Sequence, residues 1–252
     1  MQPAAQHTAV LPVRGQVQLH VLPEPAALAA ATAQRFSQWL SPVEHERWQR
    51  FRLEADRQRF LLARALVRSV LGTCVQQAPE SLQFVCNHYG KPELLQPAAT
   101  PEQTLKFNLS HTRGVLVLAV TLADEVGVDV ECMTRDVEML PLAERFFAAS
   151  ETAMLHATAA AAFREQFFRL WTLKEAYVKA RGLGLQLGLD SFAFAFASDG
   201  TPRLHPASAD DASAWSFALL EYAESFRVAL AVNAGGIESA HITLCQHAFE
   251  LQ

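Results

Sequence analysis

The sequence predicts an α+β chain of two similar α/β halves, related by a pseudo-two-fold axis and with a ligand site between them. The main observation is an internal repeat with an offset of about 111 residues: Leu62–Arg68 matches Leu173–Lys179, and Gly90–Leu94 matches Gly200–Leu204. Two further matches have nearly the same offset: Lys106-Phe107 with Ser216-Phe217, and Val115–Ala123 with Arg227–Gly235. In addition, the pattern of each half predicts long helices followed by strands. We place the boundary after residue 123, which gives halves of 1–123 and 124–252.

The first half begins its helices at Ser41-Pro42-Val43-Glu44, a capping box with proline in the first turn, and this helix runs to about Phe51. Apolar residues spaced three and four apart predict a second helix over about Ala55–Leu71, which Gly72 ends. Strands are expected at about 82–87, 105–110 and 115–123.

The second half is predicted to open with a strand over Val126–Glu131. Helices are expected at about 139–148, 150–161 and 163–181, the last of them ended by Gly182 and Gly184. Strands follow near 191–197, 214–222, 226–233 and 241–246. This order of helices and hairpins favours an α+β chain over a doubly wound sheet.

The composition is that of an ordinary globular protein, with 252 residues, a formal net charge of −5, and 50% apolar and 19% charged residues. The longest apolar run, Gly114–Ala123, is about half of what a membrane helix needs. The first residues do not resemble a secretory signal, so we expect a cytoplasmic protein that contacts no membrane. Its acidic balance disfavours nucleic acid as a partner. Its four cysteines form no close pair, which predicts free thiols.

Two acidic residues alternate with valines in Val126–Glu131, and strand geometry places Asp129 and Glu131 on one face with α-carbons roughly 6.5–7 Å apart. Gly127 is expected to leave open space beside them. Two adjacent carboxylates repel unless a cation lies between them, and Mg²⁺ takes such oxygen ligands. The hexapeptide by itself favours a solvated strand face, where Asp and Glu are common.

Two further segments carry polar side chains. Glu175 and Lys179 are four residues apart on one helix face with Trp171, which by itself is also typical of a surface ion pair. Phe107–His111 is a strand that ends in hydrogen-bonding side chains, and Tyr89–Pro92 precedes it. A histidine after a strand is often structural.

Taken together, these segments resemble the 4′-phosphopantetheinyl transferases of the surfactin-synthetase-activating type. That family has a G-[VI]-D-[VI]-E strand followed by W-[ST]-x-K-E-[AS]-x-x-K, here Gly127–Glu131 and Trp171–Lys179, and upstream Y-G-K-P and F-N-[IL]-S-H segments. The resemblance covers about 41–199. It implies transfer of phosphopantetheine from coenzyme A to a serine of an apo acyl or peptidyl carrier protein, with Mg²⁺ and release of 3′,5′-ADP. It also implies a monomer of two fused, similar halves.

The resemblance further implies a role for each matched residue. Mg²⁺ is expected on Asp129, Glu131 and Glu175. Coenzyme A is expected on residues of both halves: Arg47, Lys91, Asn108, Ser110, His111 and Asp129. Glu175 or a metal-bound water takes the serine proton, and Lys179 steadies the leaving phosphate. Some relatives have a basic residue where Glu44 stands, so phosphate binding from that helix is expected either to be weaker here or to be supplied by Arg57, Arg64 or Arg68.

Two alternatives from other classes remain open. One is a coenzyme A or carrier-protein binding module that has lost catalysis, which the intact Asp129, Glu131, Glu175 and Lys179 disfavour. The other is an unrelated metal-dependent phosphoesterase, or a nucleic-acid binder that uses the arginines of 47–68. The sequence leaves open whether the carrier belongs to a fatty acid, polyketide, nonribosomal peptide or lysine pathway.

Overall fold

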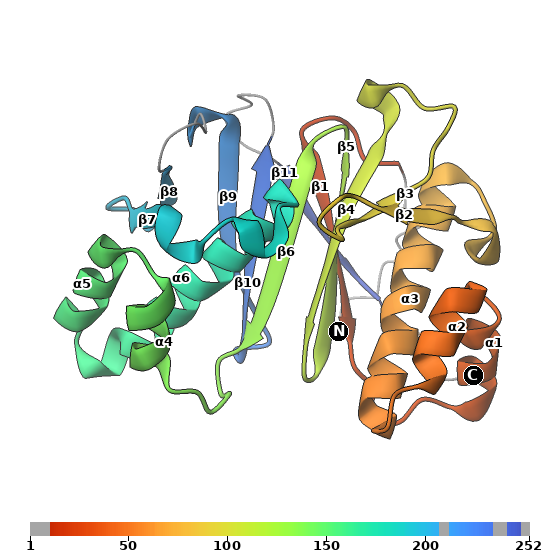
Figure 1. Ribbon diagram of the computed structural model, residues 1–252, viewed down its shortest axis with the longest axis horizontal. Coiled ribbons are helices and arrows are strands. Elements are labelled where there is room, and N and C mark those ends of the chain that lie inside the picture. The colour runs from red at the N-terminus through yellow and green to blue at the C-terminus, as the bar shows by residue number, and fades with distance from the viewer. Residues whose placement is uncertain (1–10, 207–211, 234–240, 248–252) are drawn as a thin grey trace, which may run out of the picture.

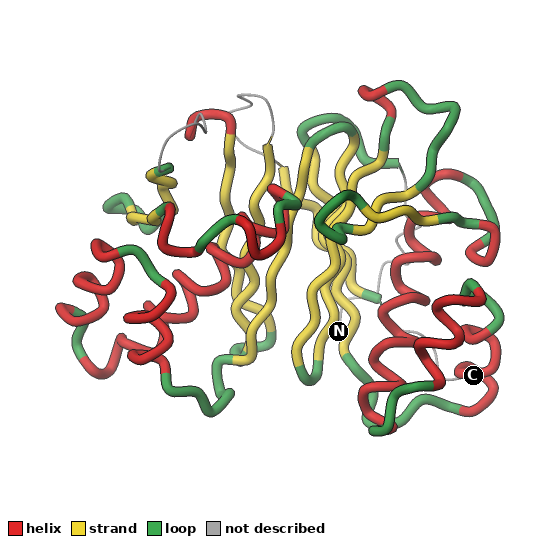
Figure 2. Tube along the Cα trace, viewed as in Figure 1, coloured by secondary structure: helices red, strands yellow, loops and turns green. Residues whose placement is uncertain are grey.

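The computed structural model describes residues 11–206, 212–233 and 241–247. Two sheets lie side by side in the middle of the molecule, and helices cover their outer faces (Figures 1 and 2). None of the helices in these described ranges is long and apolar enough to span a membrane. The predicted α+β class is confirmed.

The first half contains one strand, three helices and then two hairpins: β1 (Gln16–Pro23), α1 (Ala30–Ser37), α2 (Pro42–Gln49), α3 (Glu54–Val75), β2 (Phe84–Cys86), β3 (Pro92–Leu94), β4 (Leu105–Thr112) and β5 (Val115–Leu122). The second half repeats that order with β6 (Glu125–Cys132), α4 (Met139–Phe146), α5 (Ala149–Ala157), α6 (Ala160–Arg181), β7 (Ala193–Phe196), β8 (Pro202–His205), β9 (Trp215–Tyr222) and β10 (Phe226–Asn233). Strand β11 (His241–Gln246) follows. Single 3₁₀ turns lie at Pro79–Ser81, Pro101–Gln103, Gly184–Gln186, Leu189–Ser191 and Ala212–Ala214.

The pairing of the strands repeats as well. The order β1-β5-β4 in one sheet corresponds to β6-β10-β9 in the other, and all of these pairs are antiparallel. The element order therefore agrees with the internal repeat of the sequence, while the two-fold axis stays a prediction. One strand departs from the repeat: β11, from the C-terminal half, pairs in parallel with β1 of the N-terminal half.

Three clusters of apolar side chains form the core, one within each half and one between the halves. Helix α3 packs on the first sheet through residues such as Leu62 and Leu66, and α6 packs on the second through residues such as Phe167 and Leu173. Between the two sheets lies a core of small branched side chains that includes Val117 and Val128. Sheets that pack face to face interlock their inward residues in this way.

Most predicted elements are present, with one clear difference at α3. The capping box at Ser41 is confirmed, because its hydroxyl accepts a bond from the Glu44 N–H and the Glu44 carboxylate accepts one from the Ser41 N–H. Gly72 does not end α3: the helix continues to Val75, and Gln76 takes the left-handed conformation there. The Gln77 N–H returns to the Gly72 carbonyl, which closes the helix end one turn later than predicted.

Strand β1, which the sequence reasoning did not identify, carries a buried histidine. His20 is 0% exposed, and its Nδ1 lies 2.7 Å from Nε2 of His247, just beyond β11. Burial and the neighbouring His247 lower the pKa of His20 to about 3. Both rings are therefore neutral at pH 7, and they join the first and last described strands.

We expect the free energy of unfolding to decrease as the pH falls below about 6.5, because the unfolded chain then binds a proton on His20 that the folded protein does not bind until about pH 3. The slope due to this one proton is about 1.4 kcal/mol per pH unit. Urea unfolding between pH 7 and pH 5 measures it. In His20→Gln, unfolding should take up about one proton fewer over this pH range, so the free energy of unfolding should depend less steeply on pH. Equal slopes in the two proteins would show that His20 does not cause the pH dependence.

Candidate active site

Strand β6 lies at the seam between the halves, where its outer edge faces β4. That edge has no main-chain partner among the described strands, and side chains of β4 take that place. The Val128 N–H donates to Oδ1 of Asn108 at 2.9 Å, and the Val130 N–H donates to Oγ of Ser110 at 3.4 Å. Buried N–H groups need such partners. The N-terminal half therefore fixes the strand that carries the predicted carboxylates.

The face of β6 that carries Gly127, Asp129 and Glu131 packs directly on α6 at Gly127. A β-carbon at this position would lie 2.0 Å from the Ala176 carbonyl oxygen and 2.4 Å from the Ala180 nitrogen. The expectation of open space beside the carboxylates is therefore wrong, because the backbone of α6 fills it. This close approach brings Glu175 and Lys179 of α6 to the face of β6 that carries Asp129 and Glu131.

Asp129 is the centre of the site, and the residue is only 5% exposed. Its Oδ1 accepts hydrogen bonds from Lys179 Nζ at 2.6 Å and from Ser110 Oγ at 2.9 Å. Lys179 also donates to Ser110 Oγ at 2.9 Å, so three residues from three elements form one hydrogen-bonded group. The second oxygen of Asp129, Oδ2, is buried and has no partner in the described part of the chain. A buried carboxylate face of this kind contradicts the solvated alternative.

Two more carboxylates lie beside Asp129. Glu131 accepts from the indole N–H of Trp171 at 3.1 Å and pairs with Arg135 at 3.1 Å. Burial and then the charge of Asp129 raise the pKa of Glu131, and the same two causes raise the pKa of Glu175. The negative charge of Asp129 therefore repels the charges of Glu131 and Glu175 at this seam.

The fit of a metal ion can be judged from these side chains. Within the described ranges, no three acidic, histidine or cysteine side chains gather closely enough to hold one. Lys179 and Arg135 are paired with Asp129 and Glu131 instead. Even so, the donors are all oxygens, as Mg²⁺ prefers, and the unpartnered Oδ2 of Asp129 is a ligand atom that nothing described here uses. The residue types fit Mg²⁺, and the cation pairs must open to admit it.

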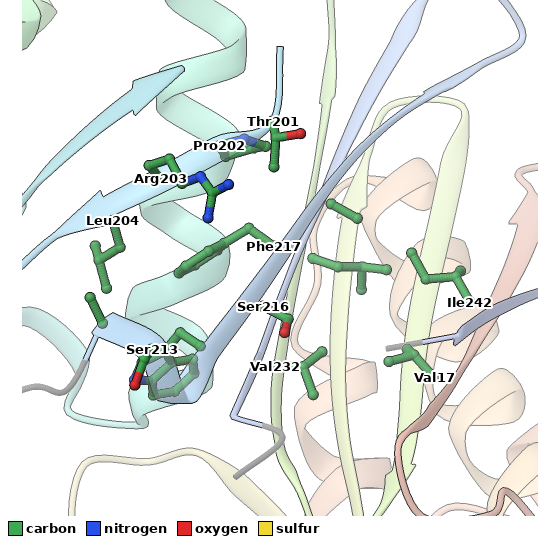
Figure 3. A pocket seen from close by; sticks show the side chains of 14 residues that line it. Val17, Thr201, Pro202, Arg203, Leu204, Ser213, Ser216, Phe217, Val232 and Ile242 are labelled. Atoms are coloured by element: carbon green, nitrogen blue, oxygen red, sulfur yellow. The ribbon is translucent and has the colours of Figure 1, made fainter. Parts of the chain in front are cut away.

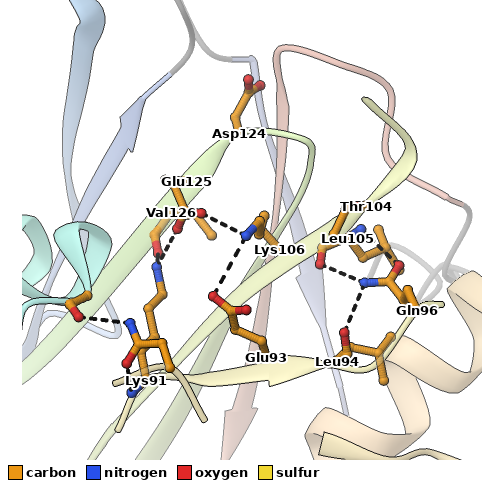
Figure 4. A network of polar contacts seen from close by, with 12 residues as sticks. Lys91, Glu93, Leu94, Gln96, Thr104, Leu105, Lys106, Asp124, Glu125 and Val126 are labelled. Carbon is orange, nitrogen blue, oxygen red and sulfur yellow. Dashed lines mark hydrogen bonds and ion pairs between the residues drawn. The ribbon is translucent and has the colours of Figure 1, made fainter. Parts of the chain in front are cut away.

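Several predicted coenzyme A residues have structural partners instead. Lys91 is buried and donates to Glu125 Oε2 at 2.8 Å, to the Ala180 carbonyl at 2.9 Å and to the Val126 carbonyl at 3.3 Å (Figure 4). It joins the β2–β3 hairpin to β6 and α6, and all three of its N–H groups are used. A contact of Lys91 with coenzyme A stays a prediction, and it would require Lys91 to exchange one of these partners.

Asn108 and Ser110 also have protein partners, since their side chains are buried and bonded to β6 as described above, and their contact with coenzyme A likewise stays a prediction. His111, the next residue of the motif, is exposed. Partial desolvation and two cations, Arg59 and Lys179, lower the pKa of its ring. Among these motif residues, His111 is the one that the structure leaves open to a ligand near Lys179.

The arginines of α2 and α3 also differ in whether their side chains are free to contact a phosphate. Arg47 is exposed, and its guanidinium lies 5.5 Å from the centre of the Phe60 ring. Arg68 is 2% exposed and donates to Glu44, Pro79 and Leu82, so it cannot supply the phosphate contact expected of it. Arg64 faces Glu44 at 3.7 Å, and Arg57 pairs with Glu54 at 3.5 Å. Glu44, the predicted departure from the family pattern, therefore pairs with Arg64 and Arg68, two of the three arginines expected to supply the phosphate contact.

Two functional details escaped the sequence reasoning. Lys174, next to Glu175 in the motif, is completely buried and pairs with Glu151 at 2.6 Å while donating to the carbonyls of Leu189 and Phe192. It anchors α6 from the side opposite the site. The second is Arg135, which follows Glu131 in a loop where no periodic pattern marks it.

A cavity of about 470 Å³ lies away from this site, between β8–β10 and strands β1 and β11 (Figure 3). Its lining includes Arg203, Trp215 and Phe217, and it contains none of the residues described above. This cavity is therefore separate from the predicted active site.

Comparison with known proteins agrees with the motif resemblance. Residues 125–231 match the model of the 4′-phosphopantetheinyl transferase superfamily, and residues 29–123 match a 4′-phosphopantetheinyl transferase N-terminal model. The 4′-phosphopantetheinyl transferase HetI of Nostoc sp. is 35% identical over 78% of this chain and 79% of its own length. The 4′-phosphopantetheinyl transferase Sfp of Bacillus subtilis is 34% identical over 66% of this chain and 71% of its own.

Other matches are shorter. The protein slr0495 of Synechocystis sp. is 34% identical over 60% of this chain and 60% of its own length. Among solved structures, the holo-[acyl-carrier-protein] synthase of Thermotoga maritima matches 43% of this chain and 61% of its own, at 29% identity and a TM-score of 0.35. Since the HetI and Sfp matches extend over most of both chains, this protein belongs to the 4′-phosphopantetheinyl transferase superfamily.

Proposed function

We propose that this protein transfers the 4′-phosphopantetheine group of coenzyme A to a serine hydroxyl of an apo acyl or peptidyl carrier protein. The serine oxygen forms a bond to the β-phosphorus of coenzyme A, and the bond from that phosphorus to the oxygen of 3′,5′-ADP breaks. Membership of the family supports this reaction. One chain supplies both sides of the seam, so the proposed functional unit is a monomer.

The observation that carries the proposal is the contact of Lys179 with Asp129 beside Glu175 at the seam. Lys179 holds a positive charge where negative charge develops on the phosphate oxygens. Glu175 is the proposed acceptor of the serine proton, because its carboxylate lies at the seam near Asp129 and Lys179. The proton therefore moves from the serine oxygen to a carboxylate oxygen of Glu175 as the new bond forms.

Asp129, Glu131 and Glu175 are the residues that would hold Mg²⁺, which when bound offsets the negative charge of the diphosphate. Arg47 and His111 are the proposed coenzyme A contacts, since both are exposed. Lys91, Asn108 and Ser110 act behind them by fixing β6 and the C-terminal end of α6.

A mass-shift assay tests the proposal. The protein is incubated with coenzyme A, Mg²⁺ and a panel of apo carriers from fatty acid, polyketide, nonribosomal peptide and lysine pathways. We expect at least one carrier to gain the mass of the phosphopantetheine group, and the gain to stop when Mg²⁺ is chelated. If coenzyme A binds but no carrier gains mass, the protein is a binding module without transferase activity.

A further inference from the structure

Glu131 is held from two sides in the described structure. On one side the indole N–H of Trp171 donates to Oε1 at 3.1 Å. On the other, a single guanidinium nitrogen of Arg135 lies 3.3 Å from Oε1 and 3.1 Å from Oε2. Both oxygens of the carboxylate are therefore in contact with one positive charge. The Glu131 side chain is 11% exposed, so this pair is much less screened by solvent than a surface pair.

The position of Arg135 is fixed by its main chain. Arg164 of α6 donates to the carbonyls of Met133 and Arg135, at 2.9 Å and 3.0 Å, and so holds the loop after β6 against the helix. The side chain of Arg135 remains 41% exposed, which leaves it room to move away from Glu131 while its backbone stays in place. The loop therefore places a movable cation on a fixed carboxylate.

A divalent ion and a guanidinium compete for the same carboxylate oxygens. Asp129 differs from Glu131 in this respect, because its Oδ2 is already without a partner. Glu131 has no oxygen free of Arg135, and no three acidic side chains gather in the described residues. Arg135 thus occupies both carboxylate oxygens of Glu131, which are then not available to bind a metal ion together with Asp129 and Glu175.

We propose that Arg135 is the resident counter-ion of Glu131, which a divalent metal must displace, and that Arg135 thereby sets the metal concentration that the enzyme requires. The inference rests on the proposed function, since it concerns the metal of that same site. If so, removal of Arg135 strengthens metal binding, because the metal no longer competes with a guanidinium for the oxygens of Glu131.

Binding of Mn²⁺ tests this directly. The protein is saturated with coenzyme A, no carrier is added so that nothing turns over, and free Mn²⁺ is followed by electron paramagnetic resonance after subtraction of coenzyme A alone. We expect Arg135→Gln to bind Mn²⁺ roughly threefold to tenfold more tightly than the unaltered protein, as removal of a competing, partly exposed charge implies. Arg135→Lys, which keeps a positive charge near Glu131, should stay within about twofold.

Arg145→Gln is the matched control, because it removes the same charge from an exposed residue of α4 and should leave Mn²⁺ affinity unchanged. Thermal unfolding verifies that each variant is folded. Equal or weaker Mn²⁺ binding by Arg135→Gln overturns the inference and leaves the proposed function intact. If the unaltered protein binds no Mn²⁺ at all, the metal part of the proposed function fails, and the inference is overturned with it.

Discussion

Replacement of Asp129 by asparagine is expected to lower the turnover of carrier modification roughly a thousandfold or more. Asparagine keeps the size of the side chain, and its carbonyl can still accept from Ser110. It removes the negative charge that pairs with Lys179 at 2.6 Å and the anionic character of the unpartnered Oδ2. Lys179 is then free to turn away from the reacting phosphate. Single-turnover rates of phosphopantetheine transfer, followed by mass spectrometry, measure the loss.

The control for this variant is Asp136→Asn, which makes the same chemical change at an exposed position of the loop after β6. It should retain nearly full turnover. Urea unfolding separates catalysis from stability, because a catalytic role requires that Asp129→Asn still fold cooperatively. A folded Asp129→Asn protein with turnover near that of the unaltered protein would remove Asp129 from the proposed mechanism.

Gly127→Ala is expected to reduce the free energy of unfolding by about 3 kcal/mol or more, at the upper end of what overpacking costs. The added methyl group would lie 2.0 Å from the Ala176 carbonyl oxygen and 2.4 Å from the Ala180 nitrogen. Both obstacles are backbone atoms of α6, so no side chain can turn aside and the helix must move. Since α6 carries Glu175 and Lys179, the folded fraction should also lose activity.

Gly188→Ala is a suitable comparison, because its φ of −59° suits alanine and its nearest obstacle is the carboxylate end of Asp190, which can move. Its effect on denaturant unfolding should be small. If Gly127→Ala unfolds at the same denaturant concentration as Gly188→Ala, α6 does not pack on β6 as closely as described here.

The buried polar side chains show where sequence reasoning reaches its limit. The spacing of Asp129 and Glu131 correctly places both on one face of a strand, because alternation is a property of the strand itself. Lys91, Asn108 and Ser110 were assigned to coenzyme A by their place in motifs. In the structure they also have protein partners far away in sequence: Asn108 bonds to Val128, 20 residues away, and Lys91 bonds to Ala180, 89 residues away. No local pattern predicts such a contact.

From the sequence we could predict features that depend on residues close together in the chain: the capping box at Ser41, the helix end at Gly182 and the paired carboxylates of β6. We could also recognise the motifs that this chain shares with its family. Only the tertiary structure decided which polar groups are already occupied, that β11 returns to β1, and that Arg135 covers Glu131. The physical reason is that side-chain hydrogen bonds and ion pairs form across packed elements, so their partners are chosen by the approach of whole strands and helices rather than by spacing along the chain.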